Sequence, residues 1–527
     1  MIKKLLLCLS ALAITLSLPA FAQGDAGPIG GADERPPVDW NRAESAGTLS
    51  GIKSGALERT LWRGQKRSSI EFLIAKLPDI QPMRSVLNLQ RRLLLTEADA
   101  SLITNDIGPL RGNDLLIQRI RKLMAMGLYD NAWDLYTQRS EDPYDVSIAQ
   151  LGMLLLVMKN DLATACLEEK AIARRYPSDA FFKMLDGACN EVLGTGEAPQ
   201  FPQSPVLQAL YHDASYNVSA AAPGTLERMG DLERALLLAN GRISYDGLTP
   251  ALLKTTPSAL IGLYLMDGKL PESARALLRA EAESRGMAWH IPAIASDPAW
   301  RKARDMGKDK EAQWPLLQES LHRISHPADL APYIDMLAEA APPDLSTETL
   351  TKALGAFLAS ARPLPPFWLK AAQQKAAEKP LFYIYLQSFA SLTPTRAEPV
   401  TSENLKKALA ALKPADSDQI IAIIETLDKN AGILNNLDGI YDKHSILTLE
   451  GNYVMPSTVL NVMLETAPEQ KQLGITVLAV LNTLAASPDN MYSGSVRKAL
   501  GSMLNVGLIE DAKLIGAEAI ASVLSKY

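Results

Sequence analysis

A short phrase recurs along the chain, and each copy separates two stretches of helical periodicity. Its five copies occupy residues 126–132, 159–165, 229–235, 267–274 and 506–512. Each copy combines a Gly or Asn with acidic residues and a small Ala. Gly or Asn can end a helix in the left-handed conformation, and acidic residues favour the positive start of the next helix. The phrase therefore predicts repeated antiparallel helical hairpins.

The spacing of this phrase defines the size of the repeating unit. In the first four copies the Gly or Asn is Gly127, Asn160, Gly230 and Gly268, at intervals of 33, 70 and 38 residues. If the interval of 70 covers two units, the unit matches the period of about 34 residues typical of tetratricopeptide repeats. An ordinary helix–turn–helix would use the same residue types, but without a near-constant interval. We therefore predict an all-α chain, an α-solenoid or superhelix of tetratricopeptide-like antiparallel helical hairpins.

The composition favours helices over strands. Aromatic residues make up 6% of the chain, whereas Leu and Ala dominate it. Strands favour β-branched and aromatic residues, and helices favour Ala, Leu and other unbranched residues. The least helical pattern is Gly439–Val454, which we interpret as a loop or a short strand pair.

The first 22 residues have the three parts of a secretory signal peptide. Lys3 and Lys4 precede an apolar run from Leu5 to Leu18, and Ala20–Ala22 supplies an Ala-x-Ala cleavage site. We predict cleavage between Ala22 and Gln23 and export to the periplasm. An uncleaved anchor is the alternative, but about 20 apolar residues are needed to span a bilayer.

Without the signal peptide the chain holds 51 basic and 59 acidic residues, a net charge of −8. This acidic balance argues against nucleic acid as a partner. No later segment is apolar over a sufficient length, so we predict no transmembrane segment in the mature chain.

The mature chain is predicted to have three parts. We predict a flexible leader over residues 23–50, an N-terminal helical-repeat domain over 51–340 and a C-terminal helical domain over 341–527. The Pro-rich breaks at 341–343 and 362–366 suggest where the boundary between the two helical domains lies.

Cys166 and Cys189 are candidates for a disulfide, because exported thiols meet oxidising conditions. They lie on two predicted helices on either side of the break at Tyr176–Asp179, at equal distances from it. Residues equidistant from the turn of an antiparallel pair stand at the same height, which suits the roughly 4.4–6.8 Å between alpha carbons that a disulfide requires. The alternative is two unpaired cysteines in the core.

Several phrases carry a resemblance to a known family: Thr60–Gly64, Met83–Leu95, Gly507–Ala512 and Glu518–Ala519, together with the cysteine-bearing hairpin. They resemble an uncharacterised family of exported, periplasmic alphaproteobacterial proteins built from tetratricopeptide-like helices. The resemblance extends over most of the mature chain. It implies a periplasmic helical solenoid and no particular activity.

No pattern in the sequence predicts a catalytic residue, a cofactor or a metal. His322 and His326 share a spacing of four, but they lack the Glu of a zinc protease, and Pro327 places His326 at a helix end. Glu283–Gly286 faintly resembles the acid segment of lytic transglycosylases, without the rest of that motif. Glu168 and Glu169 are interpreted as a solvated helix face.

Three tryptophans form the candidate binding surface: Trp289, Trp300 and Trp314. If their segment lines a concave face, they can hold peptide or sugar by stacking, but they can equally fill the packing between helices. We predict a non-catalytic periplasmic scaffold that binds another envelope protein or a peptide. The alternative is a cell-wall-modifying, glycan-cleaving enzyme that uses an acid pair. Clustered carboxylates on the concave face would favour the enzyme, and a broad apolar or mixed-charge groove would favour the scaffold.

Overall fold

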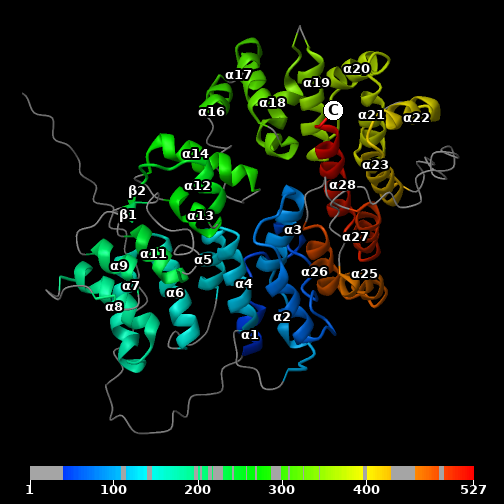
Figure 1. Cartoon of the computed structure of the whole chain (residues 1–527). Helices are drawn as coiled ribbons and strands as arrows, with labels where there is room; N and C mark the ends of the chain where they lie inside the picture. Colours follow the sequence, from blue (N-terminus) through cyan, green and yellow to red (C-terminus); the bar gives the residue numbers. More distant parts are fainter. Residues whose placement is uncertain are drawn as a thin grey trace, which may run out of the picture. The chain divides into compact units, whose positions relative to one another are not determined.

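The chain is all-helical, as the sequence predicts (Figure 1). A computed structural model describes residues 40–107, 114–138, 145–194, 200–201, 204–211, 216–217, 229–239, 243–256, 258–266, 270–285, 298–306, 309–324, 326–342, 345–395, 400–428, 457–485 and 492–527. Within these residues, regular strands are confined to one parallel pairing, β1 (Tyr216–Asn217) with β2 (Ile243–Ser244). The signal peptide, its cleavage site at Ala22 and Gln23, and the stretch Gly439–Val454 lie outside the described residues.

The α-helices of the first part of the chain are α1 (Trp40–Ser45), α2 (Arg67–Lys76), α3 (Arg84–Leu95), α4 (Asp114–Ala125), α5 (Tyr129–Thr137), α6 (Val146–Met158), α7 (Leu162–Ile172), α8 (Ala180–Val192), α9 (Pro205–Tyr211), α11 (Asp231–Ala239), α12 (Pro250–Thr255), α13 (Ser258–Met266), α14 (Glu272–Ser284), α16 (Pro298–Asp305) and α17 (Lys310–Arg323). Three short 3₁₀ helices accompany them: η1 (Ile52–Ser54), η2 (Ala100–Leu102) and η3 (Ala173–Arg175).

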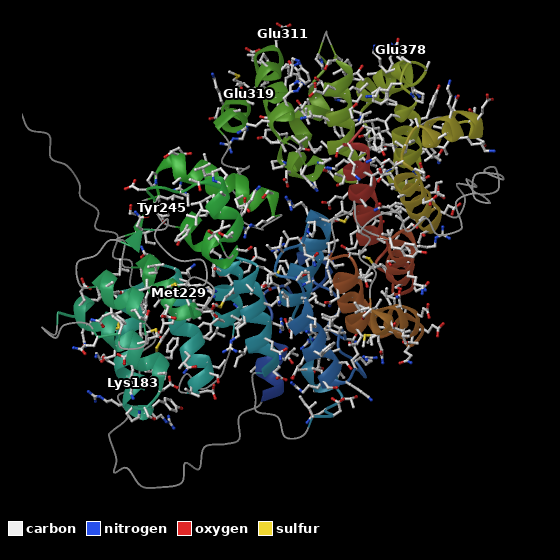
Figure 2. The ribbon with its side chains drawn as sticks, viewed as in Figure 1. Lys183, Met229, Tyr245, Glu311, Glu319 and Glu378 are labelled. Atoms are coloured by element: carbon white, nitrogen blue, oxygen red, sulfur yellow. A yellow bond between two sulfur atoms is a disulfide. The ribbon has the colours of Figure 1, made fainter. Side chains whose placement is uncertain are left out.

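The remaining helices are η4 (Pro327–Tyr333), α18 (Ile334–Glu339), α19 (Thr347–Ala359), α20 (Pro366–Ala376), α21 (Leu381–Leu392), α22 (Ser402–Ala410), α23 (Pro414–Leu427), α25 (Thr458–Glu469), α26 (Leu473–Thr483), α27 (Ser493–Asn505) and α28 (Ile509–Leu524). Their apolar faces meet in the core, and their polar faces turn outward. Met229 and Tyr245 are buried, whereas Lys183, Glu311 and Glu378 are exposed (Figure 2).

Three of the five predicted turns have the expected left-handed residue. Gly127, Asn160 and Gly507 have φ of 76°, 62° and 84° and follow α4, α6 and α27. After each, the next N–H donates to the carbonyl five residues earlier, at 2.8, 2.9 and 2.9 Å. This is the Schellman arrangement, which satisfies the last carbonyls of a helix and reverses the chain.

The turn prediction is wrong at Gly230, which does not take the left-handed conformation. Gly230 directly precedes α11, and its N–H donates to Glu233 Oε2 at 2.8 Å, so it begins a helix. Gly268 lies outside the described residues. The same left-handed turn also occurs where the sequence gives no Gly, at Ala361 and Lys471.

Residues 40–50 were predicted to belong to the flexible leader, and the structure corrects this. Trp40–Ser45 form α1, and Leu49 pairs with Thr96 in a parallel bridge. Helix α1 is held against the rest of the protein by a buried ion pair between Glu44 and Arg67, at 2.5 Å. Both side chains are at most 3% exposed. A buried carboxylate with a bidentate guanidinium partner fixes the segment that carries it.

Helices that follow one another in sequence pack together from α4 to α8, and α19, α21 and α23 also pack in succession. The stacking is not purely sequential, however. Helix α28 contacts α3, η4, α19, α21, α23 and α27, and α26 contacts α2 and α3. The predicted domain boundary between residues 340 and 341 falls between α18 and α19. The contacts of α26 and α28 with helices α2 and α3 join the two sides of this boundary. The division into two domains stays a prediction.

We call residues 40–527, as far as the structure describes them, the helical unit. The first and last helices of this unit contact each other through helix caps. The N-terminus of α26 is capped by residues of the loop before α2. Gly474 N–H donates to the Leu61 carbonyl at 3.0 Å, and Ile475 N–H donates to Gln65 Oε1 at 2.9 Å. The buried Trp62 lies against Gly474, where a β-carbon would meet its ring at 2.5 Å. Only Gly fits between the two segments at this point.

Candidate functional site

A cavity of about 800 Å³ lies among α2, α4, α5, α6, α11 and α13, and it is the candidate functional site. Part of its lining is apolar: Ile74, Ala75, Pro78, Ile80, Met124, Ala125 and Met158. The rest is polar or charged: Asp79, Gln118, Arg121, Lys122, Tyr129, Asp231, Arg234 and Ser258. Its volume falls in the range of ordinary ligand sites, roughly 300–1,000 Å³.

The helix ends bring the charged residues of the cavity together. Arg121 and Lys122 occupy the last turns of α4, where the helix dipole favours cations. Asp231 lies in the first turn of α11, where the dipole favours anions. The Schellman turn at Gly127 reverses the chain after α4 and places Tyr129 at the start of α5.

Two ion pairs lie on the cavity wall. Lys122 Nζ donates to Asp79 Oδ1 at 2.8 Å and to the Leu77 carbonyl at 2.6 Å. Arg234 is 3.4 Å from Asp231 Oδ1. Arg121 is exposed and forms no hydrogen bond or ion pair with the described residues. Burial raises the pKa of the Tyr129 hydroxyl, and the nearby Asp231 raises it further. The cavity therefore combines an apolar floor with a surplus of positive charge.

The predicted disulfide partners lie at disulfide-bonding distance. The sulfur atoms of Cys166 and Cys189 are 2.01 Å apart, and their alpha carbons are 5.3 Å apart. Both residues are buried, on α7 and α8. Asp179 caps α8 by accepting from Phe181 N–H at 2.9 Å.

The three predicted tryptophans are not seen to form one surface. Trp289 lies outside the described residues, and Trp300 lies on α16 with a side chain that is not described. Trp314, on α17, packs against the buried Trp368, with ring centroids 6.2 Å apart. For Trp314 this geometry agrees with packing between helices, and the shared binding surface stays a prediction.

The two histidines have separate partners. His322 Nδ1 is 3.0 Å from Glu348 Oε1. His326 begins η4, where its Nδ1 accepts the Ala328 N–H at 3.3 Å. His326 is therefore the N-cap of the helix that follows it, with Pro327 as the first helical residue. In the described part of the chain no group of three His, Cys, Asp or Glu residues is arranged to hold a metal ion.

The second carboxylate of the Glu168–Glu169 pair is not on the surface. Glu169 is 1% exposed, whereas Glu168 is exposed. Burial is the largest cause of its shifted pKa, which rises to about 7; Lys170 lowers it and Asp186 raises it. The prediction of a solvated pair is wrong for Glu169, because it shares the buried face of α7 with Cys166, three residues earlier.

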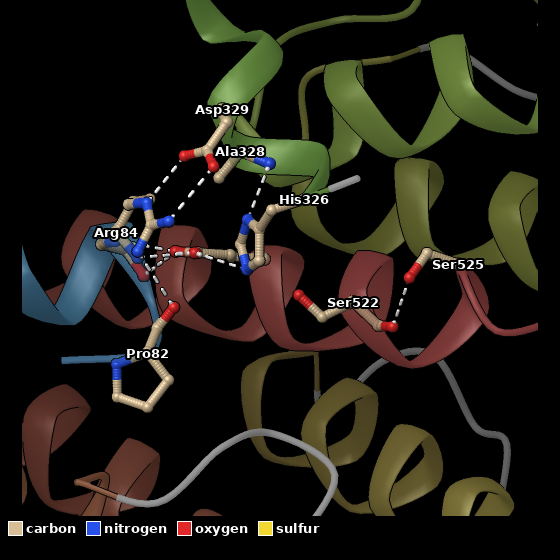
Figure 3. A network of polar contacts seen from close by, with 9 residues as sticks. Pro82, Arg84, His326, Ala328, Asp329, Ser522 and Ser525 are labelled. Carbon is tan, nitrogen blue, oxygen red and sulfur yellow. Dashed lines mark hydrogen bonds and ion pairs between the residues drawn. The ribbon is translucent and has the colours of Figure 1, made fainter. Parts of the chain in front are cut away.

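A second polar cluster joins the first and last parts of the helical unit (Figure 3). Glu518 of α28, 1% exposed, accepts the backbone N–H groups of Arg84 and Ser85 at 2.6 and 2.7 Å. Arg84 forms a bidentate pair with Asp329 at 2.7 and 3.1 Å. His326 Nε2 lies 3.8 Å from Glu518 Oε1. Glu518 thus caps the N-terminus of α3 from a distant part of the sequence, which makes this cluster a structural junction.

The other end of α3 is capped by Arg119. This side chain, 1% exposed, donates to the carbonyls of Leu94, Thr96, Glu44 and Ala46 at 2.8, 3.0, 3.1 and 2.8 Å. Burial lowers its pKa to about 10, and Glu44 partly offsets this shift. Helix α3 therefore has an anion at its positive end and a cation at its negative end.

Sequence reasoning did not find the cavity. Its lining comes from six helices and from the loop after α2, between residues 67 and 266, and no spacing in the sequence links them. The only local signal is the pair Arg121–Lys122 just before the first repeated phrase, and that position suits a basic residue for the helix dipole alone.

Within the described part of the chain, no helix is both long and apolar enough to cross a bilayer. Comparisons with known protein families, curated proteins and solved structures find no match. Any function for this chain must therefore rest on its own geometry.

Proposed function

We propose that the chain is an exported, non-catalytic helical-repeat scaffold that binds a peptide segment of another envelope protein. The cavity among α2, α4, α5, α6, α11 and α13 carries this proposal, since its walls combine apolar side chains with charged groups of both signs. Peptide sites need apolar surface for affinity and a few fixed polar groups for orientation. The disulfide-distance cysteine pair and the predicted signal peptide support a place outside the cytoplasm.

Tetratricopeptide-like stacking is part of this proposal. The shared left-handed turns at Gly127, Asn160 and Gly507 and the packing of successive helices support it. The contacts of α28 limit where a groove can lie, because α28 covers faces of α19, α21 and α23. The binding surface that we propose is therefore in the first part of the chain.

The enzyme alternative finds less support in the cavity. Glycoside hydrolysis uses two carboxyl groups, one of which must keep its proton. The two cavity carboxylates, Asp79 and Asp231, each have a cation partner, Lys122 and Arg234. Each carboxylate is thus held in an ion pair on the cavity wall, which suits binding better than an acid pair directed at a substrate.

A site-specific photocrosslinker tests the proposal. A photoreactive phenylalanine replaces Ala75, an exposed residue of the cavity wall, and the chain is irradiated in its native cells. We expect an adduct with one envelope protein, mapped by mass spectrometry to a single segment. The same group at Ala410, exposed on α22 and away from the cavity lining, is the control and should give no such adduct. Equal adducts at both positions, or none at Ala75, would reject the proposal.

A further inference from the structure

We propose that the cavity recognises an acidic side chain flanked by apolar residues, within a peptide segment of the partner. This inference rests on the proposed function, because it assumes that a peptide occupies the cavity. It adds the chemical character of the segment and the residue that selects it.

The charges of the cavity do not cancel. Three cations, Arg121, Lys122 and Arg234, face two carboxylates, Asp79 and Asp231. Lys122 is bound by Asp79 and by a backbone carbonyl, and Arg234 is paired with Asp231. One positive charge remains, on a chain whose mature form has an expected net charge of −8. The cavity is locally positive on an acidic protein, and it attracts a carboxylate.

Arg121 is the residue that carries the unpaired charge. It is exposed, and the described residues supply it with no hydrogen bond and no ion pair. A guanidinium in this state can bind an incoming carboxylate in bidentate fashion without first breaking an internal pair. Lys122 and Arg234 would have to give up a partner to do the same.

The floor beside Arg121 is apolar. Met124 and Met158 are 5% and 4% exposed, and both line the cavity. Methionine side chains are flexible and fit apolar groups of different shapes. A carboxylate on Arg121 would thus have apolar side chains next to it, and the segment expected is one acidic residue among Leu, Val or Phe.

The probe for this inference is a library of heptapeptides with blocked ends. The central residue is Glu, Asp, Gln or Lys, and the other positions are drawn from Ala, Leu, Val, Phe and Ser. Peptides retained by the purified chain are quantified by mass spectrometry. We expect the Glu or Asp pool to be enriched about tenfold over the Gln pool. A carboxylate binds the Arg121 guanidinium more strongly than a neutral amide does. The Lys pool should be excluded.

The variant Arg121→Ala should lose this tenfold preference and still bind apolar peptides. Arg174→Ala is the matched control, since Arg174 of η3 is exposed and is also without a partner among the described residues. It should keep the preference.

Equal retention of the Glu and Gln pools would overturn the inference and leave peptide binding intact. Retention seen only when the same library is made with a free C-terminal carboxylate would overturn it as well. If no pool binds, both the inference and the proposed function fail.

Discussion

At the scale of single residues, buried charge decides how stability depends on pH. Glu169 on α7 is 1% exposed, and its Oε2 accepts no hydrogen bond. The Lys170 ammonium lies 3.8 Å away but is also bound by Asp186. This oxygen has lost its water without gaining a hydrogen bond, and burial is the largest cause of the raised pKa of Glu169.

The variant Glu169→Gln tests this at one position. The pKa of Glu169 rises from 4.5 in the unfolded chain to about 7 in the folded chain, so its stabilising contribution is complete below pH 4.5 and is lost as pH rises through 7. Between pH 5 and 8 the variant should therefore lose part of the pH dependence of the unfolding free energy. At pH 8 it should be more stable by about 1–3 kcal/mol. Urea unfolding from pH 4 to pH 8 measures both effects.

Glu168→Gln is the control for this prediction. Glu168 is adjacent but exposed, so its replacement should leave the pH profile unchanged. Parallel profiles for the wild type and Glu169→Gln would contradict the raised pKa.

Some residue roles could not be predicted because the partner is remote in sequence. The pattern Asp416-Ser417-Asp418-Gln419 is typical of a capping box before Ile420. In the structure α23 begins earlier, at Pro414, and Asp416 accepts from the Tyr527 hydroxyl at 2.6 Å and from Lys526 at 3.2 Å. The expected cap was local, whereas the partners found are more than 100 residues away.

At the scale of helices, the sequence predicts those helices and turns that depend only on residues adjacent in the chain. The apolar periodicity of the sequence predicts helices over Ser85–Leu95, Leu115–Met126 and Leu473–Leu484. Helices α3, α4 and α26 match these ranges within about two residues. The left-handed turns with Gly or Asn were found because a short phrase encodes them. Those at Ala361 and Lys471 were missed, since neither residue favours a positive φ and the surrounding helices must impose it.

The α7–α8 hairpin offers a direct test at this scale. Replacing both Cys166 and Cys189 with Ser should lower the unfolding free energy by about 3 kcal/mol, because a bridge between them restricts the unfolded chain. Urea unfolding without reductant measures the loss. Reductant should destabilise the wild type by a similar amount and leave the double variant unaffected. A wild type with two free thiols by mass spectrometry would defeat the prediction.

The cap on α3 can be tested with a nearly isosteric change. Glu518 accepts two backbone N–H groups and the Ser85 hydroxyl. Its Oε1 accepts from Arg84 N–H, and its Oε2 accepts from Ser85 N–H and Oγ–H. Glu518→Gln replaces one acceptor with a donor, so at least one buried N–H loses its partner. We expect a loss of about 2–4 kcal/mol. Hydrogen exchange should become faster at the first amides of α3.

Glu510→Gln, an exposed change on the same helix, should alter the unfolding free energy by less than about 0.5 kcal/mol. If Glu518→Gln were equally mild, the capping role would be wrong.

At the scale of the whole molecule, residues 40–107 depend on residues 457–485 and 492–527, and the reverse is also true. Segment 61–65 caps α26, and α28 caps α3. Arg92 of α3 also binds Asp511 of α28. No periodicity in the sequence could reveal these contacts, because each joins residues about 400 positions apart. The cavity was unpredictable for the same reason, since only packing in space brings its helices together.

Gly474→Ala tests this mutual dependence. A β-carbon at Gly474 would meet the ring of the buried Trp62 at 2.5 Å, so the two segments must separate. We expect a loss of about 1–3 kcal/mol in unfolding free energy, as for other overpacked sites. Gly501→Ala is the matched control in α27, because the nearest atom to its β-carbon is 3.9 Å away. It should be neutral or stabilising by up to about 1 kcal/mol. Equal stability of both variants in urea would contradict the close approach.

The exchange of caps has a consequence for how the protein is made. A ribosome releases the chain from its first residue onward, so α3 is synthesised long before Glu518 exists. Until then the first amides of α3 have only water as a partner, and the apolar surface that will meet α26 and α28 stays uncovered. Contacts of such long sequence separation form late and slowly. A nascent chain of this protein therefore has to be kept from aggregating until its last helix has emerged.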